Sequence, residues 1–186
     1  MIALGSSHTL SVVAAGPGTL TYQWTLNDKN ISGATKASYL IAKAALNQAG
    51  AYRCVVKSGA TTATSDPAEI GVVDTTPKTV NLFASPTASF SATVNAAGNG
   101  ITYVWLKNGG DSAFNAKSFV IKPAAAEHAG LYTCTVTGLA GTFTGGAPTR
   151  LTVSNAAPQI VKPLSLPPAV IGQAYFYQIP IANVVG

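Results

Sequence analysis

Charged side chains are scarce in this sequence. Among its 186 residues, 11 are lysine or arginine and 6 are aspartate or glutamate, so that 9% are charged, whereas an ordinary soluble domain carries roughly 25%. With six carboxylates and two histidines, the chain lacks the side chains from which most acid–base and hydrolytic sites are built. We therefore expect no enzyme activity, no catalytic residues and no bound cofactor.

Cysteine is equally sparse, and this argues against a structural zinc site. The two cysteines, Cys54 and Cys134, lie 134 − 54 = 80 residues apart. Together with only two histidines they cannot supply four ligands at any recognisable zinc-binding spacing. We expect no metal site of this kind.

Two further classes of partner are disfavoured by what the sequence lacks. No uninterrupted apolar run approaches the ~18–20 residues that a membrane helix needs, so we expect no membrane span. The net charge is +5, but the basic residues are scattered singly and none is adjacent to another. Because phosphate binding needs basic residues clustered on one face, we expect no nucleic-acid partner. Hydrophobic residues reach 47%, which is enough to build cores and excludes intrinsic disorder.

What the sequence does contain is an internal repeat. Residues 20–24 read Leu-Thr-Tyr-Gln-Trp and residues 101–105 read Ile-Thr-Tyr-Val-Trp, while residues 49–54 and 129–134 both read Ala-Gly-x-Tyr-x-Cys. Matching positions are offset by 105 − 24 = 81 and 134 − 54 = 80 residues. Each copy has about the size of a small independent domain, and we place the two domains at residues 1–74 and 78–154.

Within each copy, apolar and polar residues alternate. Tyr22, Trp24 and Leu26 would share one face of a strand, and residues 131–136 show the same alternation. Turn residues such as Gly-Pro-Gly at 16–18 separate these runs. This pattern predicts half-buried β-strands and an all-β fold.

Two segments favour helix instead. Residues 42–49 and 123–129 are rich in alanine, and Gly50 or Gly130 follows each of them at once, as in a helix C-cap. Because so few residues are available, we expect at most one short helical turn in each copy.

The spacing of these landmarks resembles that of immunoglobulin-like β-sandwiches. Trp24 and Trp105 precede Cys54 and Cys134 by 54 − 24 = 30 and 134 − 105 = 29 residues, and each cysteine ends a Gly-x-Tyr-x-Cys run. That gap is too short for the two extra strands of a variable domain, so the resemblance is to intermediate-type domains. It implies tandem Greek-key sandwiches of about seven strands each.

The resemblance is strongest to the tandem repeats of large bacterial surface or secreted proteins. Those repeats carry a Tyr-Gln-Trp … Asn … Ile-Ser-Gly-Ala-Thr pattern, which residues 22–35 reproduce. The second copy departs from the pattern, with Asn-Gly-Gly-Asp-Ser-Ala at 108–113.

The resemblance also implies a structural core of six residues: Trp24, Tyr52, Cys54, Trp105, Tyr132 and Cys134. The tyrosines would form tyrosine corners, with each hydroxyl bonded back to the backbone. The second-strand positions that hold a disulfide partner in the family are occupied by Val12 and Ala92, so neither sandwich can close an inter-sheet bridge. We interpret both cysteines as buried free thiols, with an intermolecular disulfide or a reactive thiol as the alternative. Because Ala92 is small, Phe90 or Phe119 should fill the adjacent space, unless a small cavity remains.

The sequence offers few polar or aromatic residues from which a binding site could be built. The acidic residue that the family carries six positions before the cysteine is replaced by Gln48 and His128. His128 follows Glu127, but no third orienting group accompanies them, so we assign the pair to a turn rather than to catalysis. The aromatic residues expected to be exposed, on which a ligand could stack, are Phe114, Phe143 and the cluster at 175–177; the cluster is also interpreted as core of a third module.

Segments rich in threonine, proline or alanine, at 74–78 and 154–158, are predicted to be linkers. Asp74 stands alone at the first linker and the second has no carboxylate, so we do not expect calcium there. Residues 157–186 resemble the start of a cadherin-like immunoglobulin module, with Pro158, Leu166-Pro167, Gly172 and Tyr175 at its opening positions. So short a segment cannot bury a core alone.

The third module is therefore expected to be truncated. We expect no signal peptide after Met1, and we expect the chain to be a fragment of a longer protein. The uncharged strand predicted at 173–181 would be an open edge. We expect it to be paired, either within its complete domain or by β-addition to a neighbouring subunit. Comparing the mass of residues 1–156 and 1–186 by light scattering tests this expectation.

The predicted function is that of a non-enzymatic modular segment of a large bacterial cell-surface or secreted protein, acting as spacer, adhesive or filament-forming repeats. The alternative is an immunoglobulin-like decoration or tail domain of a bacteriophage virion protein. Expected partners are proteins, either neighbouring modules or like subunits, and surface glycans; the expected location is extracellular. An accessory module of a glycoside hydrolase would need an adjoining catalytic domain with two close carboxylates, which this stretch lacks.

Overall fold

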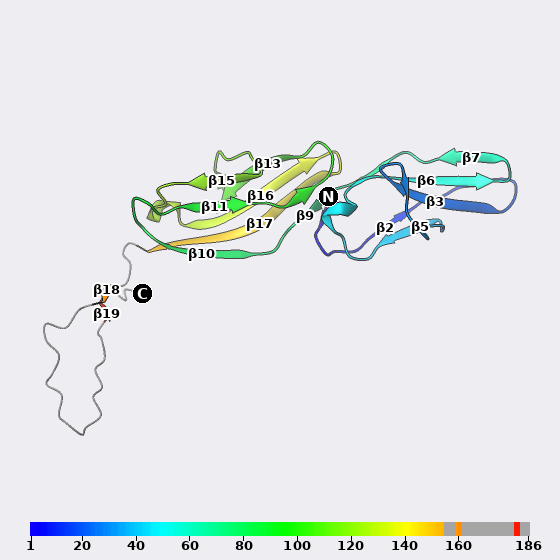
Figure 1. Cartoon of the computed structure of the whole chain (residues 1–186). Helices are drawn as coiled ribbons and strands as arrows, with labels where there is room; N and C mark the ends of the chain where they lie inside the picture. Colours follow the sequence, from blue (N-terminus) through cyan, green and yellow to red (C-terminus); the bar gives the residue numbers. More distant parts are fainter. Residues whose placement is uncertain (155–158, 161–180, 183–186) are drawn as a thin grey trace, which may run out of the picture.

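The computed structural model describes residues 1–154, 159–160 and 181–182 (Figure 1). The third module predicted at 157–186, with its strand at 173–181 and its aromatic cluster at 175–177, lies outside the described residues except for two short strands. These strands, β18 (Gln159–Ile160) and β19 (Ile181–Ala182), pair in antiparallel fashion.

The first repeat forms a sandwich of two sheets. Its smaller sheet pairs β2 with β5, and its larger sheet has the order β4-β3-β6-β7, with β8 also paired to β6. The strands are β2 (His8–Ser11), β3 (Leu20–Leu26), β4 (Lys29–Asn30), β5 (Ser38–Ile41), β6 (Gly50–Ser58), β7 (Thr61–Thr64) and β8 (Ala68–Ile70).

The second repeat has the same arrangement. Its larger sheet has the order β10-β17-β16-β13-β14, in which β10 runs parallel to β17, and its smaller sheet pairs β11 with β15. The strands are β10 (Lys78–Phe83), β11 (Phe90–Thr93), β13 (Thr102–Lys107), β14 (Gly110–Asp111), β15 (Ser118–Ile121), β16 (Gly130–Gly138) and β17 (Gly141–Ser154). This strand order confirms the all-β prediction of tandem immunoglobulin-like sandwiches.

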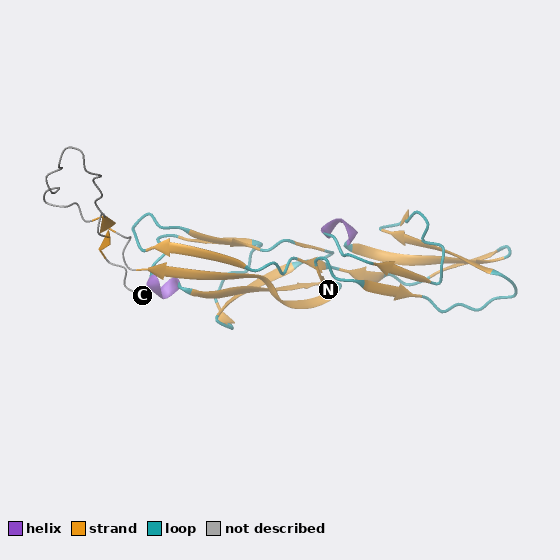
Figure 2. Ribbon diagram, turned by 90° about the horizontal axis from the view of Figure 1, so that it is seen from below, coloured by secondary structure: helices purple, strands orange, loops and turns teal. Residues whose placement is uncertain are grey.

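Each sandwich contains one short 3₁₀ turn, η1 (Leu46–Gln48) or η2 (Ala126–His128), so the alanine-rich segments form three helical residues each (Figure 2). The interpretation of Gly50 and Gly130 as helix C-caps is wrong, because each glycine is the first residue of a strand. Gly50 has φ +145°, and a side chain there would collide with Asn27. The glycine is thus required by the close approach of the Asn27 side chain, which accepts a hydrogen bond from the next backbone N–H.

The interior of the chain holds two hydrophobic clusters that meet at a short strand, β9 (Val72–Val73). Successive side chains on a strand point to opposite faces. Val72 accordingly packs into the first cluster and Val73 into the second, and both are 0% exposed. One strand therefore contributes a core residue to each sandwich.

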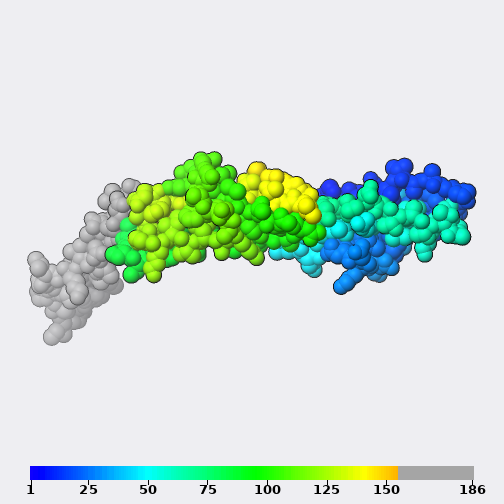
Figure 3. Space-filling view, turned by 90° about the horizontal axis from the view of Figure 1, so that it is seen from above, coloured from blue at the N-terminus to red at the C-terminus, as the bar shows by residue number. Residues whose placement is uncertain are grey.

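Strand β9 is the middle strand of a small sheet between the sandwiches. It pairs in parallel with β1 (Ile2–Ala3) of the first sandwich and in antiparallel fashion with β12 (Ala96–Ala97) of the second. The two sandwiches consequently lie end to end (Figures 1 and 3). The chain is already bound to the second sandwich at Asp74, whose N–H donates to the Asn95 carbonyl, so the linker predicted at 74–78 is not free at its first residue.

Candidate functional site: core landmarks, junction and edge groove

The two tryptophans lie at equivalent places in the two cores. Trp24 is 3% exposed and Trp105 is 0% exposed. Each indole N–H donates to a backbone carbonyl, that of Lys36 in the first sandwich and that of Ala116 in the second, both at 2.9 Å. Each ring is thus buried with its polar atom satisfied, which leaves no ring face for a ligand.

The two cysteines lie opposite these tryptophans, Cys54 opposite Trp24 and Cys134 opposite Trp105. Both thiols are unpaired and fully buried. Burial raises the pKa of Cys134 to about 11 and also raises the pKa of Cys54. Since the thiolate is the reactive form, both side chains act as small apolar groups.

Val12 and Ala92, which were expected at equivalent second-strand positions, are placed differently in the two sandwiches. Ala92 is buried on β11, whereas Val12 follows the end of β2 and is only half-buried. Ala92 pairs with Phe119, and the residue that pairs with the equivalent Tyr39 in the first sandwich is the buried Leu10. The expectation that Val12 holds this second-strand position is therefore wrong, although Val12 packs against the first core. The strand ends at Ser11 because pairing between β2 and β5 extends only from His8 to Ser11.

Aromatic rings fill the space beside Ala92. Phe119 packs edge-on against Trp105, with ring centroids 5.0 Å apart, and Phe90 packs edge-on against Phe119 at 5.7 Å. Phe114 stacks flat on Phe119 at 4.2 Å. Phe114 and Phe143 are half-buried and pack against the second core, so the expectation that both are exposed ligand platforms is wrong.

Tyr52 and Tyr132 are hydrogen-bonded to the helical turns that contain Gln48 and His128. The Tyr52 hydroxyl donates to the Gln48 carbonyl at 2.7 Å, and the Tyr132 hydroxyl donates to the His128 carbonyl at 2.8 Å. Burial, with a smaller contribution from neighbouring Tyr39, raises the pKa of Tyr52 to about 12. Both tyrosine hydroxyl bonds have the geometry of a tyrosine corner.

Gln48 and His128 each close their own helical turn. Gln48 Oε1 accepts the N–H of Ala45 at 2.9 Å, and His128 Nδ1 accepts the N–H of Ala125 at 3.0 Å. The two side chains therefore do the same work as the acceptor in a capping box. Because Nδ1 of His128 is occupied by this bond, the ring has a structural role in the turn.

The surface around His128 is a depression that also includes Lys107, Asp111 and Tyr132. Its polar groups are engaged locally: Asp111 Oδ1 accepts the N–H of Ala113 at 2.8 Å, and Lys107 Nζ donates to the Glu127 carbonyl. The contacts bring together no nucleophile with a base that is itself oriented by a third group, which is the arrangement that catalysis requires.

The junction between the sandwiches is held by hydrogen bonds from both sides. The Met1 amino group donates to the Ala140 carbonyl at 2.6 Å, and Asn99 Nδ2 donates to Glu69 Oε2 at 3.0 Å. A side chain at Gly71 would collide with the Met1 thioether. The junction is thus packed and hydrogen-bonded rather than a free tether.

Asp74 closes the turn that leads from β9 to β10. Its Oδ1 accepts the N–H of Thr76 at 2.9 Å. Hydrogen bonds from Thr76, with smaller contributions from Asn95 and Lys78, hold the pKa of the Asp74 carboxyl below its ordinary value. The ionised carboxylate therefore stabilises the turn.

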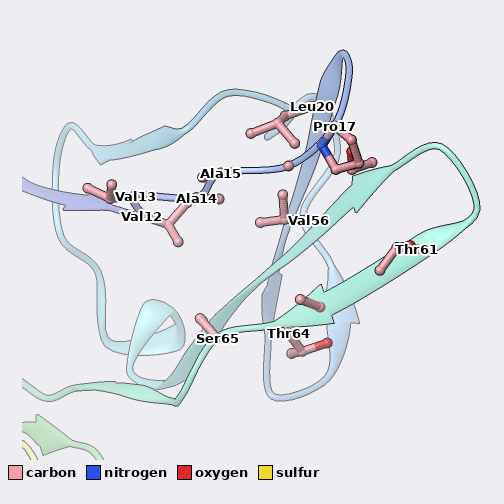
Figure 4. Close-up of a pocket in the computed structure, with 13 residues that line it drawn as sticks. Val12, Val13, Ala14, Ala15, Pro17, Leu20, Val56, Thr61, Thr64 and Ser65 are labelled. Carbon is pink, nitrogen blue, oxygen red and sulfur yellow. The ribbon is translucent and has the colours of Figure 1, made fainter.

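An apolar groove of about 260 Å³ lies along one edge of the first sandwich (Figure 4). One wall is residues 12–17, the other is the β7 side with Thr61, Ala63, Thr64 and Ser65, and Leu20, Val56 and Ser58 complete the lining. We call it the edge groove. None of its lining residues is charged. Ser58 Oγ is buried there and has no hydrogen-bond partner among the described residues.

Two classes of feature are missing from the described ranges. No helix in them is long and apolar enough to cross a membrane. Across the same residues, no three histidine, cysteine, aspartate or glutamate side chains gather as a metal site would require.

No protein-family model and no curated protein matches the chain. Among solved structures, it is similar to immunoglobulin domains 1–5 of Sidekick-1, with 20% identity over 87% of this chain and a TM-score of 0.39. It is also similar to an I-band fragment of titin, with 19% identity over 84% of the chain and a TM-score of 0.39. A third is the four N-terminal Ig domains of a Dscam1 isoform, with 19% identity over 82% and a TM-score of 0.40. The chain spans 39%, 62% and 42% of these three structures.

Proposed function

We propose that this chain is a non-enzymatic modular segment of a large bacterial cell-surface or secreted protein, in which immunoglobulin-like modules hold other parts of the protein at a fixed spacing. The proposed modules are residues 1–74 and 78–154, followed by a third module from residue 157. The single observation that carries the proposal is the shared strand β9, which places Val72 in one core and Val73 in the next.

A shared strand suits a spacer because it couples two self-contained cores. Bending the junction would require Val72 or Val73 to leave its core, which exposes a fully buried valine at a cost of about 1.5–3 kcal/mol. It would also break the pairing of β9 with β1 and β12. The angle between neighbouring modules is therefore fixed by core packing.

Charge contributes little to this cohesion. The single ion pair among residues 1–154 joins Arg53 Nε to Asp28 Oδ1 at 3.9 Å, and the Asp28 side chain is 89% exposed. Exposed pairs of this kind contribute about 0–1 kcal/mol. A segment held by apolar cores and strand pairing keeps its shape when the ionic strength of its surroundings changes.

The proposed partners are proteins, as neighbouring modules or like subunits. Strand edges and exposed aliphatic side chains support this, since Leu40 and Val120 protrude at equivalent places and are 58% and 62% exposed. Surface glycans have weaker support, because Phe114 and Phe143 pack against the core.

The alternative proposal is a decoration or tail domain of a bacteriophage virion. A sparsely charged, strand-paired rod would serve equally well on a capsid. Antibodies raised against the folded chain separate the two: labelling of intact, unpermeabilised bacterial cells supports the surface protein, and labelling of purified virions supports the alternative. Labelling of neither, with signal only inside permeabilised cells, would contradict both proposals.

A further inference from the structure

The internal repeat allows the edge groove to be compared with the same place in the second sandwich. The strand pairings match Leu10 with Ala92 and Val12 with Val94, so the wall formed by residues 12–17 corresponds to residues 94–99. In the second sandwich that wall is covered by β9, because Val73 pairs with Ala96 and Val72 pairs with Ala97. The Asp74 N–H also donates to the Asn95 carbonyl at 2.8 Å. What is an open groove in the first sandwich is therefore a filled strand position in the second.

The opposite wall matches as well. In the second sandwich the Ala147 N–H donates to the Asp74 carbonyl at 2.9 Å, so the incoming segment touches both walls. Val73 is 0% exposed there, and a side chain built at Gly146 would come within 2.9 Å of it. In the second sandwich the corresponding position is thus packed tightly around Val73.

The edge groove has the features expected of a sandwich edge from which this strand is missing. Val13 is 100% exposed, although it is an apolar residue of the wall. No backbone N–H of residues 13–15 donates to another backbone carbonyl within residues 1–154. Ser58 Oγ is buried in the lining without a partner. Unpaired backbone and a buried unpaired hydroxyl next to apolar side chains are the features of an unfilled strand edge.

A smaller side chain on the β7 side leaves the edge groove open. Ala63 stands where the second sandwich has Phe143, which packs against its core, since Ala63 pairs with Val56 as Phe143 pairs with Val136. At about 260 Å³ the groove is below the ~300–1,000 Å³ of most small-molecule sites. Its length along two strand edges instead suits one or two side chains of an extended peptide.

We propose that the edge groove accepts an extended β-strand from a neighbouring immunoglobulin-like module, with a valine-like side chain facing inward, as the second sandwich accepts β9. Binding adds a strand to an existing edge, so backbone hydrogen bonds supply affinity and the apolar groove supplies selectivity. The new bonds can form on both walls, because residues 13–15 and Asp66, the counterpart of Ala147 by strand register, have backbone N–H groups. The inference goes beyond the spacer role proposed above and does not depend on where the protein resides.

The test uses the full chain, labelled with ¹⁵N, and a synthetic peptide of residues 69–76, the chain's own β9 segment. The expected result is saturable chemical-shift change at the amides of residues 12–16 and 61–65, with slower hydrogen exchange at residues 13–15. A control peptide in which both valines are replaced by lysine should give no saturable change. Equal shifts with both peptides, or none at millimolar peptide, would overturn the proposal.

A matched pair of variants on β7 tests the place of binding. Ala63 lines the groove and Thr62, its neighbour, does not, and both are exposed, so neither substitution should unfold the sandwich. Ala63→Lys should weaken peptide binding at least tenfold, while Thr62→Lys should change it less than twofold. An equal effect of both variants would place the peptide elsewhere. Concentration-dependent shifts of the same amides without peptide would show that a second copy of this chain fills the edge groove. That result would also overturn the proposal that a different module donates the strand.

Discussion

The two buried cysteines are the first feature of this chain that can be tested at the scale of single residues. Burial raises the pKa of both thiols, so almost no thiolate is present at neutral pH. We predict that a thiol-reactive dye labels Cys54 and Cys134 slowly in the native protein and completely in denaturant. Reducing agent should leave the melting temperature unchanged, because both cysteines are free. Rapid native labelling would mean that one of them faces solvent.

His128 gives a second prediction at this scale. Its Nδ1 accepts the Ala125 N–H in the same way as Gln48 Oε1 accepts the Ala45 N–H. We predict that His128→Gln leaves the free energy of unfolding nearly unchanged, whereas His128→Ala lowers it by about 1 kcal/mol, since the amide loses its partner. Urea unfolding of both variants measures this. Equal destabilisation by the two substitutions would contradict the capping role.

At the scale of elements, β5 and β15 occupy equivalent places but pack differently. Phe119 of β15 contacts Trp105, Phe90 and Phe114 and is 7% exposed, whereas its counterpart Tyr39 on β5 is half-buried. We predict that Phe119→Ala lowers the free energy of unfolding of the second sandwich by about 3–5 kcal/mol. Tyr39→Ala should cost the first sandwich less. Chemical denaturation followed at each tryptophan distinguishes them, and a larger effect at Tyr39 would contradict this packing.

The turn after β9 gives a pH dependence. The folded-state pKa of Asp74 is lowered, chiefly by hydrogen bonds from Thr76, so its stabilising effect is complete above the ordinary value of 3.8. That effect should be lost as the pH falls from 3.8 through the lowered folded-state pKa. We predict that the wild-type protein loses more stability over this acidic range than Asp74→Asn. Thermal melts of both proteins across the range test this, and parallel pH profiles would contradict it.

How far the sequence predicts this structure differs from element to element. Alternation and the Trp-to-Cys spacing were enough for the sandwich fold, because a period of two assigns each side chain to a face. The shared strand could not be predicted, since two adjacent valines carry no sign of which core each enters. The second-strand position equivalent to Ala92 was assigned to the wrong residue, because Val12 is as apolar as Leu10, which pairs with Tyr39 as Ala92 pairs with Phe119. The roles of Gly50 and Gly130 depend on the distant Asn27 and Asn108, which local pattern does not reveal.

At the scale of the whole molecule, the proposed spacer role depends on whether the two sandwiches move as one body. Each has its own core, and β9 enters both, between β1 on one side and β12 on the other. The hydrogen bonds from Met1 to Ala140 and from Asn99 to Glu69 add contacts across the same junction. An insertion of a few glycine and serine residues after Val73 should release this coupling while leaving the two cores folded.

The most direct test is to measure residual dipolar couplings for backbone amides of both sandwiches in one aligned sample. If β9 fixes the junction, the couplings of residues 8–70 and 78–154 will fit a single alignment tensor with the sandwiches placed as in the structure. In the variant with the glycine–serine insertion, the two sets should require different tensors. Different tensors in the unmodified protein would show a flexible junction and would contradict the account of this chain as a fixed spacer.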